Sequence, residues 1–235
     1  MFADEHTGSA ANFAYTERWL KFALWAYGGW RVHYSGPRQL GEQLQAHYRD
    51  SAVGRFDAEV MGERVYERPF ELNIVDADEV PQERDVSSPL GRHLDGCRIG
   101  FDLGASDRKV AAVIDGETVY SNEVEWDPKP QTDPQWHYDQ INEALKDAAS
   151  YLPRVDAIGG SVAGIYVNNR VQIASLFRGV DPGDFEARVK PLFLLLRDAW
   201  RVPFELANDG EVTALAGSMS IDANGVLGVA MGSSE

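Results

Sequence analysis

The chain has 235 residues, of which 44% are hydrophobic and 25% are charged, a composition typical of a globular protein with one large or two small domains. Its 37 acidic and 22 basic side chains give a formal net charge of -15 at pH 7. This balance argues against nucleic acid as a partner, because nucleic-acid binders need basic surface. Cys97 is the single cysteine, which excludes an intramolecular disulfide and a cysteine-based zinc site and fits a cytoplasmic location.

Residues 1–97 are expected to form a helix-rich N-terminal extension. Its aromatic segment WLKFALWAYGGW, residues 19–30, indicates an amphipathic helix. This segment is too short to span a bilayer, carries Lys21 and lacks the features of a signal peptide, so no membrane partner is expected.

A polar connector rich in proline and serine, at about residues 76–91, is the candidate boundary of this extension. It follows the strand-like segment PFELNIV. The extension contains no motif with recognisable chemistry, and its role stays open. One hypothesis is a cap over the following domain, held by Trp19, Phe22, Trp25 and Trp30.

The pattern becomes regular from Arg98 onward. Alternating apolar residues predict three successive strands, at residues 99–103, 109–114 and 118–126. Asp115-Gly116 is a strong two-residue hairpin turn between the last two.

A helix is predicted next, because Asp133 and Pro134 supply an N-cap and a first-turn proline ahead of apolar residues at helical spacing. VDAIGGSVAG, residues 155–164, then predicts a buried strand that enters a glycine-rich turn. DFEARVKPLFLLLRDAW, residues 184–200, predicts a helix that Pro191 should kink.

The last segments are a short strand in VPFELAND, a helix in GEVTALAGS that closes on Gly217, and a strand in GVLGVAMGSS. The order is three strands, then helix, strand, helix, strand, helix and a final strand. The sequence therefore predicts an α/β fold with a meander of three strands and further strands joined through helices.

Three strand-to-turn junctions combine polar residues with glycine: DLGAS at 102–106, LANDGE at 206–211 and VAMGSS at 229–234. Open α/β sheets place their ligands at such strand ends. Each junction alone is a weak signal, since it also suits a plain turn or helix cap. The P-loop motif GxxxxGK[ST] and a GxGxxG turn after a strand are both absent from the sequence.

Taken together and in this order, the junctions resemble those of the ROK family (repressors, open reading frames, kinases). Residues 98–235 resemble the first half of a ROK sugar kinase, a family within the actin-like ATPase superfold. The matching segments are DLGASDRKVAAVID, IGGSVAGIYVNN with ASLFRGV, ELANDGEVTALAGSM and LGVAMGSS. The resemblance implies an actin-like, ribonuclease H-like first lobe with a mixed sheet.

The resemblance also implies roles for individual residues, with ATP and Mg²⁺ as cofactors and a sugar and a nucleotide as partners. Asp209 would be the catalytic base, and Asp102 would hold Mg²⁺, through water. Residues placed near the sugar are Asn208, Ser175 and Gly164, and residues placed at the nucleotide phosphates are Gly104, Ala105, Ser106, Lys109, Gly232, Ser233 and Ser234.

Simpler readings of the same residues stay open. Asp209 also suits the start of the helix that follows, and Asn208 could brace the loop instead of contacting sugar. Lys109 could be a solvated strand residue, because an alternating strand exposes one face.

The sequence departs from the family pattern in three ways. Ala105 and Ser106 replace the usual Gly and Thr of the first turn, and Ala163 replaces a proline near the sugar. The sequence also stops at Glu235, just after the second phosphate turn. The expected organisation is an extension at 1–97, a first lobe at 98–220 and the start of a truncated second lobe at 221–235. The final strand would then be an unpaired edge, and the chain would be inactive alone.

The leading function is ATP-dependent phosphoryl transfer to a hexose or amino sugar, realised only with the second lobe. The partner expected beyond sugar and nucleotide is a homo-oligomer or the missing second lobe. One alternative is a non-catalytic sugar or nucleotide sensor on the same fold. Another is an ATPase that acts with a macromolecular partner.

Overall fold

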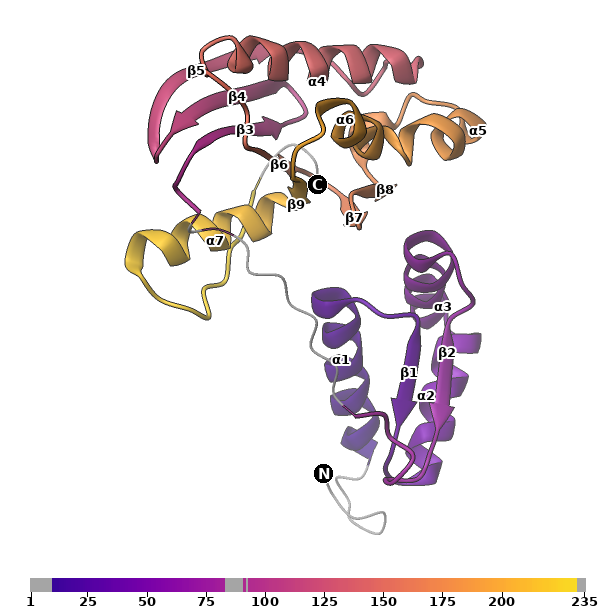
Figure 1. Ribbon diagram of the computed structural model, residues 1–235. Coiled ribbons are helices and arrows are strands. Elements are labelled where there is room, and N and C mark those ends of the chain that lie inside the picture. The colour runs from indigo at the N-terminus through magenta and orange to yellow at the C-terminus, as the bar shows by residue number, and fades with distance from the viewer. Residues whose placement is uncertain (1–9, 83–90, 92, 232–235) are drawn as a thin grey trace. The chain divides into compact units, whose positions relative to one another are not determined.

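The computed structural model describes residues 10–82, 91 and 93–231. The chain divides into two compact units, Met1–Ser87 and Ser88–Glu235, and each has its own hydrophobic core. Figure 1 labels the elements of both units.

The first unit combines helices with a small parallel sheet. Its elements are α1 (Ala10–Tyr27), β1 (Arg31–Tyr34), α2 (Arg38–Asp50), α3 (Ala52–Glu59), the π-helical segment η1 (Val60–Tyr66) and β2 (Glu71–Ile74). β1 pairs in parallel with β2, and Val32 lies opposite Leu72. One cluster of buried core residues in this unit contains Leu24, Leu44, Tyr48, Met61 and Leu72. β2 corresponds to the strand-like segment seen in the sequence, whereas β1 was not expected.

Helix α1 contains most of the aromatic segment that was predicted to be helical. It ends at Tyr27, directly before Gly28, which has a φ of 75°. Leu24 is buried, but Trp19 and Phe22 are 56% and 55% exposed within the structure. None of the helices in the described ranges is long and apolar enough to cross a membrane.

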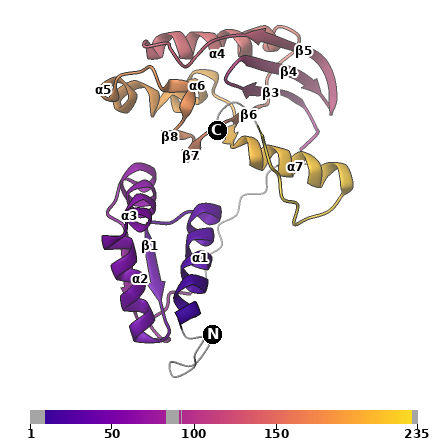
Figure 2. The same ribbon diagram turned by 180° about the vertical axis from the view of Figure 1, so that it is seen from behind.

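The second unit is built around a five-stranded sheet (Figures 1 and 2). Its elements are β3 (Cys97–Leu103), β4 (Asp107–Ile114), β5 (Glu117–Glu125), α4 (Pro134–Ala149), β6 (Ala157–Val162), β7 (Ile165–Val167), β8 (Arg170–Ile173), η2 (Ser175–Phe177), α5 (Pro182–Asp184), η3 (Phe185–Val189), α6 (Leu192–Trp200), β9 (Phe204–Ala207) and α7 (Asp209–Ile221).

The strands of the sheet lie in the order β5-β4-β3-β6-β9. β4 is antiparallel to β3 and β5, whereas β6 is parallel to β3 and β9. Asp115 and Gly116 both have positive φ, 49° and 85°, as a tight hairpin turn between β4 and β5 requires. The predicted α/β class, the mixed sheet and the three-strand meander are confirmed.

The two faces of this sheet differ, because successive side chains of a strand point to opposite faces. On β3, Ile99, Phe101 and Leu103 are buried in the core, together with residues of α4 and α6. Gly100 and Asp102 lie on the other face, where α7 runs. Both views show α4 and α7 on opposite sides of the sheet (Figures 1 and 2). One face therefore holds the core, and the other carries a cleft.

Helix boundaries in this unit follow local chemistry. The Asp133 side chain accepts a hydrogen bond from the Gln135 amide at 2.9 Å, so the predicted N-cap of α4 is confirmed. The long predicted helix at 184–200 is interrupted before Pro191, and α6 begins at Leu192. Proline lacks the N–H that would continue the hydrogen-bond ladder, which accounts for the break.

Three features differ from the expectation. Helix α7 continues past Gly217 to Ile221, because the end of the helix is set by Asp222, which has a φ of 48°. β7 and β8 form a small antiparallel hairpin that the sequence did not predict.

The third difference is the final strand. Residues 222–231, the described part of this segment, form no strand. A strand needs a partner, and no strand among the described residues pairs with it. Instead Gly228 packs closely against the backbone of Gly210 and Ala214 in α7, where a Cβ atom would clash.

Candidate functional site

The carboxyl ends of the parallel strands β3, β6 and β9 meet at one edge of the sheet. Asp102 on β3 lies beside Ser161 on β6, and Ser161 lies beside Ala207 on β9. Asp209 follows two residues after Ala207, as the first residue of α7. The sheet register therefore brings the two predicted functional carboxylates, Asp102 and Asp209, to the same edge, as expected for a ligand site in an open α/β sheet.

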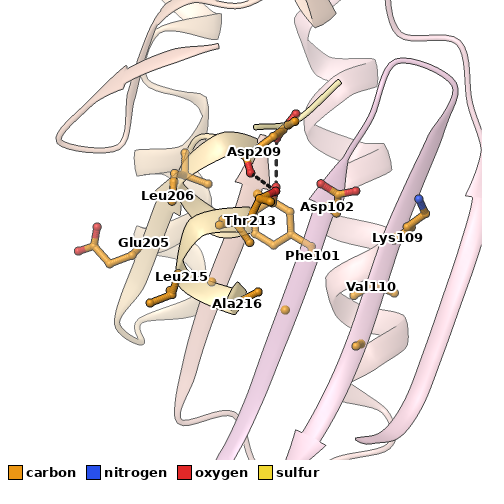
Figure 3. Close-up of a pocket in the computed structure, with 18 of the residues that line it drawn as sticks. Phe101, Asp102, Lys109, Val110, Glu205, Leu206, Asp209, Thr213, Leu215 and Ala216 are labelled. Carbon is orange, nitrogen blue, oxygen red and sulfur yellow. Dashed lines mark hydrogen bonds between the residues drawn. The ribbon is translucent and has the colours of Figure 1, made fainter. Parts of the chain in front are cut away.

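Asp209 is held by β6. The Ser161 hydroxyl donates a hydrogen bond of 3.0 Å to its Oδ1 atom, and Figure 3 shows Asp209 and Asp102 at the same end of the cleft. Burial raises the pKa of Asp209, and the negative charge of Asp102 raises it further, while the Ser161 hydrogen bond partly offsets both. A carboxyl group with a raised pKa beside a cleft is a candidate acid–base group.

Asn208 is the N-cap of α7 and uses both ends of its side-chain amide inside the protein. Oδ1 accepts from the Gly210 amide at 2.9 Å, and Nδ2 donates to the Gly164 carbonyl at 2.8 Å. Glu211 Oε2 accepts from the Asn208 amide at 3.0 Å and completes a capping box. In the structure Asn208 thus braces the loop that carries Asp209.

The backbone conformation at position 164, in the turn after β6, requires a glycine. Gly164 has a φ of 141°, a conformation that favours glycine, and a Cβ atom would lie 2.5 Å from the Ile173 carbonyl oxygen. Its carbonyl holds Asn208, so the glycine-rich turn after β6 and the start of α7 are tied together.

The hairpin between β3 and β4 is organised by Asp107, a residue that the sequence analysis did not single out. The Asp107 carbonyl accepts from the Gly104 amide at 2.9 Å. Its carboxylate accepts from the Ser106 hydroxyl at 2.9 Å and pairs with Lys109 Nζ at 3.1 Å. Lys109 and Ser106 together lower the pKa of Asp107. Trp126 supports the turn, since its indole N–H donates to the Gly104 carbonyl at 2.9 Å.

The free face of the sheet and α7 line an open cleft of about 1260 Å³. Three of the predicted site residues line it: Asp102, Lys109 and Asp209. Ser161 and Glu205 also line it and were missed by the sequence analysis. The other predicted residues with a described position, which do not line the cleft, are Gly104, Ala105, Ser106, Gly164, Ser175 and Asn208. Gly232, Ser233 and Ser234 lie outside the described residues.

The cleft is acidic. Its charged lining residues are Asp102, Lys109, Glu123, Glu205 and Asp209. A phosphate should therefore bind in this cleft more readily together with a cation, because the cation neutralises part of the phosphate charge. No group of three or more metal-ligating side chains occurs among the described residues. Mg²⁺ commonly binds through one or two carboxylates, waters and substrate phosphates, so Asp102 fits such an ion.

No family model matches the chain, and no curated protein matches it. Among solved structures, the chain is similar to an inorganic polyphosphate/ATP-glucomannokinase from Arthrobacter sp. strain KM, with 22% identity, 53% of this chain and 48% of that chain covered and a TM-score of 0.41. It is also similar to a ROK hexokinase from Thermus thermophilus, with 21% identity, 55% and 39% covered and a TM-score of 0.41.

A ROK family transcriptional regulator is a further similar structure, with 19% identity, 56% of this chain and 33% of that chain covered and a TM-score of 0.44. The chain thus spans between a third and a half of the length of these structures. The similarity to these structures covers about half of this chain.

Proposed function

We propose that the second unit is the first lobe of a sugar-kinase-type phosphotransferase that acts on a hexose or an amino sugar. The observation that carries the proposal is the position of Asp209. It is a partly buried carboxyl with a raised pKa, it begins α7 at the end of β9, and it opens on the cleft that Asp102 also lines.

Asp209 has the chemistry of the base in this proposal. A sugar hydroxyl oxygen attacks the γ-phosphorus of ATP, the bond from that phosphorus to the ADP oxygen breaks, and the hydroxyl proton passes to the Asp209 carboxylate. The hydrogen bond from Ser161 occupies Oδ1 and leaves Oδ2 for the hydroxyl. A raised pKa suits a group that must accept this proton.

The other assigned residues would handle the nucleotide. Asp102 would hold Mg²⁺, which would neutralise phosphate charge when it is bound. The amides of Ala105 and Ser106, the Ser106 hydroxyl and the Lys109 ammonium would face the phosphates. The Gly104 amide is less suited to this role, because it already donates to the Asp107 carbonyl.

The proposal covers part of a kinase. In it, residues 98–220 are the first lobe and residues 221–235 begin a second, with Gly232, Ser233 and Ser234 at the second phosphate turn. Because the chain spans between a third and a half of the length of the similar ROK structures, we expect these residues by themselves to bind ligands and to turn them over only at a trace rate.

The test is therefore a binding experiment. Glucose, mannose and their N-acetylamino derivatives are titrated into the protein with Mg²⁺ and a non-hydrolysable ATP analogue, and amide resonances are followed by NMR. We expect one sugar to bind and to shift resonances at the start of α7.

Asp209→Asn should weaken that sugar's binding about tenfold, the loss typical of one hydrogen bond to a charged group. Asp198→Asn is the matched control, because Asp198 is an exposed carboxylate paired with Arg197 at 3.0 Å. Absence of binding by every sugar, or equal effects of the two substitutions, would contradict the proposal.

A further inference from the structure

The Asp107 carboxylate occupies donors that the proposed function assigns to phosphate. Ser106 donates its hydroxyl to Oδ2 of Asp107 at 2.9 Å, and Lys109 Nζ lies 3.1 Å from Oδ1. The contacts of this one carboxylate therefore include the Ser106 hydroxyl and the Lys109 ammonium. The backbone of Asp107 is also held in place, because its carbonyl oxygen accepts a hydrogen bond from the Gly104 amide.

A carboxylate and a phosphate present the same kind of oxygen to these donors. Ser106 has a single O–H to donate, so a phosphate can accept from it only if the Asp107 carboxylate gives it up. Lys109 has three N–H donors, so a phosphate would share this ammonium with the carboxylate or displace the carboxylate from it. A phosphate that binds beside Asp107 also meets a like charge, which opposes its binding. The pair is accessible to such a ligand, since the side chains of Lys109 and Asp107 are 47% and 24% exposed.

We propose that Asp107 is an internal competitor for phosphate and sets the nucleotide affinity of this hairpin. The inference rests on the proposed function, because it takes the hairpin as a phosphate-binding site. In the free protein the Asp107 carboxylate holds Ser106 and Lys109. In the bound state these two donors turn to the phosphate and the carboxylate turns to solvent.

The experiment compares the affinity of the protein for the non-hydrolysable ATP analogue, with Mg²⁺, by calorimetry. Asp107→Asn keeps the size of the side chain but removes its charge, and Asp107→Ala removes the acceptor as well. We expect both variants to bind about fivefold more tightly, the scale set by an exposed ion pair. The indole N–H resonance of Trp126, which reports its bond to Gly104, should stay in place in both variants.

Glu123→Gln is the matched control. Glu123 also lies near Lys109, at 4.0 Å, and lines the same cleft, but it has no bond to Ser106. Competition for donors predicts a change of less than twofold for this variant. A general effect of cleft charge predicts a gain as large as that of Asp107→Asn, and this result would overturn the inference.

The two proposals fail in different ways. If the wild-type protein binds the nucleotide and the Asp107 variants bind equally or more weakly, the competition is wrong and the phosphate site stands. If neither the wild-type protein nor the variants bind, both the phosphate site and the competition are wrong.

Discussion

Asp57 in the first unit and Asp209 in the second are both helix-borne carboxylates, but their surroundings differ. Asp57 is fully buried and accepts hydrogen bonds from Lys21 Nζ at 2.7 and 2.9 Å and from the Trp25 indole at 3.0 Å. Asp209 is partly buried, accepts a hydrogen bond from Ser161 and has its pKa raised by burial and by the charge of Asp102 (Figure 3).

The difference separates a structural carboxylate from a candidate functional one. A buried charge is tolerated when a cation and further donors satisfy it, and removal of one partner is then costly. A carboxylate held on one side and opposed by a like charge keeps acceptor capacity for a ligand. By this criterion Asp57 belongs to a structural polar cluster of the first unit, whereas Asp209 fits the role of proton acceptor that we propose for it.

The largest expected effect is on the first unit. Asp57→Ala should lower its free energy of unfolding by about 3 kcal/mol, because Lys21 and Trp25 lose their shared acceptor. Urea-dependent hydrogen exchange, read over α1 and α3, measures this loss.

Asp50→Asn is the control for this substitution. Asp50 pairs with Arg49 at 2.7 Å on the surface, with 59% of its side chain exposed, so its loss should cost far less than the loss of Asp57. If the two substitutions cost the same, the buried cluster does not stabilise the unit in the way described.

The next largest effect compares the two faces of the sheet, through the stability changes caused by substituting two adjacent glycines on β6. A Cβ atom at Gly160 would lie 2.2 Å from the ring of Phe101 in the core, whereas one at Gly159 would meet nothing within 4 Å. Gly160→Ala should therefore destabilise the second unit by about 1–3 kcal/mol through overpacking. Gly159→Ala should change stability by less than about 0.5 kcal/mol. Thermal unfolding of both variants checks the contrast, and equal losses would show that the face lined by Gly159 is not open.

The strands and the polar residues at their ends could be predicted from the sequence for a physical reason. Period-two alternation and the Asp115-Gly116 turn fix the meander locally, and parallel strands bring their carboxyl ends to one edge. Asp102 and Asp209 both follow from that rule. The Asp133 capping signal likewise placed the start of α4, whereas α7 begins one residue earlier than predicted, with Asn208 and not Asp209 as its N-cap.

Ser161 and Asp107 could not be found in this way. Ser161 reaches Asp209 only because β6 pairs with β9 in the register that places it beside Ala207, and such long-range pairing leaves no local signal. Asp107 was within the segment singled out as a phosphate hairpin, but a charged residue after a turn usually faces solvent. Its contacts with Ser106 and Lys109 depend on side-chain geometry, which the sequence pattern does not indicate.

A smaller effect tests how Ser161 holds Asp209. Ser161→Ala removes the hydrogen bond that lowers the pKa of Asp209, so the pKa should rise further, with a loss of about 1 kcal/mol in stability. Carbon-detected NMR titration of the side-chain carboxyl measures the pKa directly. Ser121→Ala, which changes a cleft residue on β5, is the control and should leave the pKa of Asp209 unchanged. A fall in the pKa after Ser161→Ala would contradict the described contact.

The smallest expected effect is the amount by which the charged Asp209 carboxylate lowers the stability of the second unit. Its folded-state pKa is raised above the unfolded value of about 3.9, so the folded protein binds more protons than the unfolded chain between these two values. Stability from this group is therefore fully present below the unfolded pKa and is lost as the pH rises through the folded pKa. The position of Asp209 at the start of α7 reduces this loss of stability, because a helix N-terminus favours negative charge.

Asp209→Asn removes the charge that burial and Asp102 disfavour, while Asn208 remains as the N-cap of α7. The variant should melt at a higher temperature than the wild type at pH 7, and the gain should shrink as the pH falls towards 4. Thermal scans across that range, beside the same scans of Asp57→Asn, compare the two units directly. Loss of stability in both variants at pH 7 would mean that Asp209 is a satisfied structural carboxylate like Asp57, and the distinction between the units would fail. If Asp209 is a ligand-binding carboxylate, Asp209→Asn should raise the melting temperature at pH 7 and Asp57→Asn should lower it. The reason is that a carboxylate whose hydrogen bonds within the protein are incomplete retains affinity for a substrate.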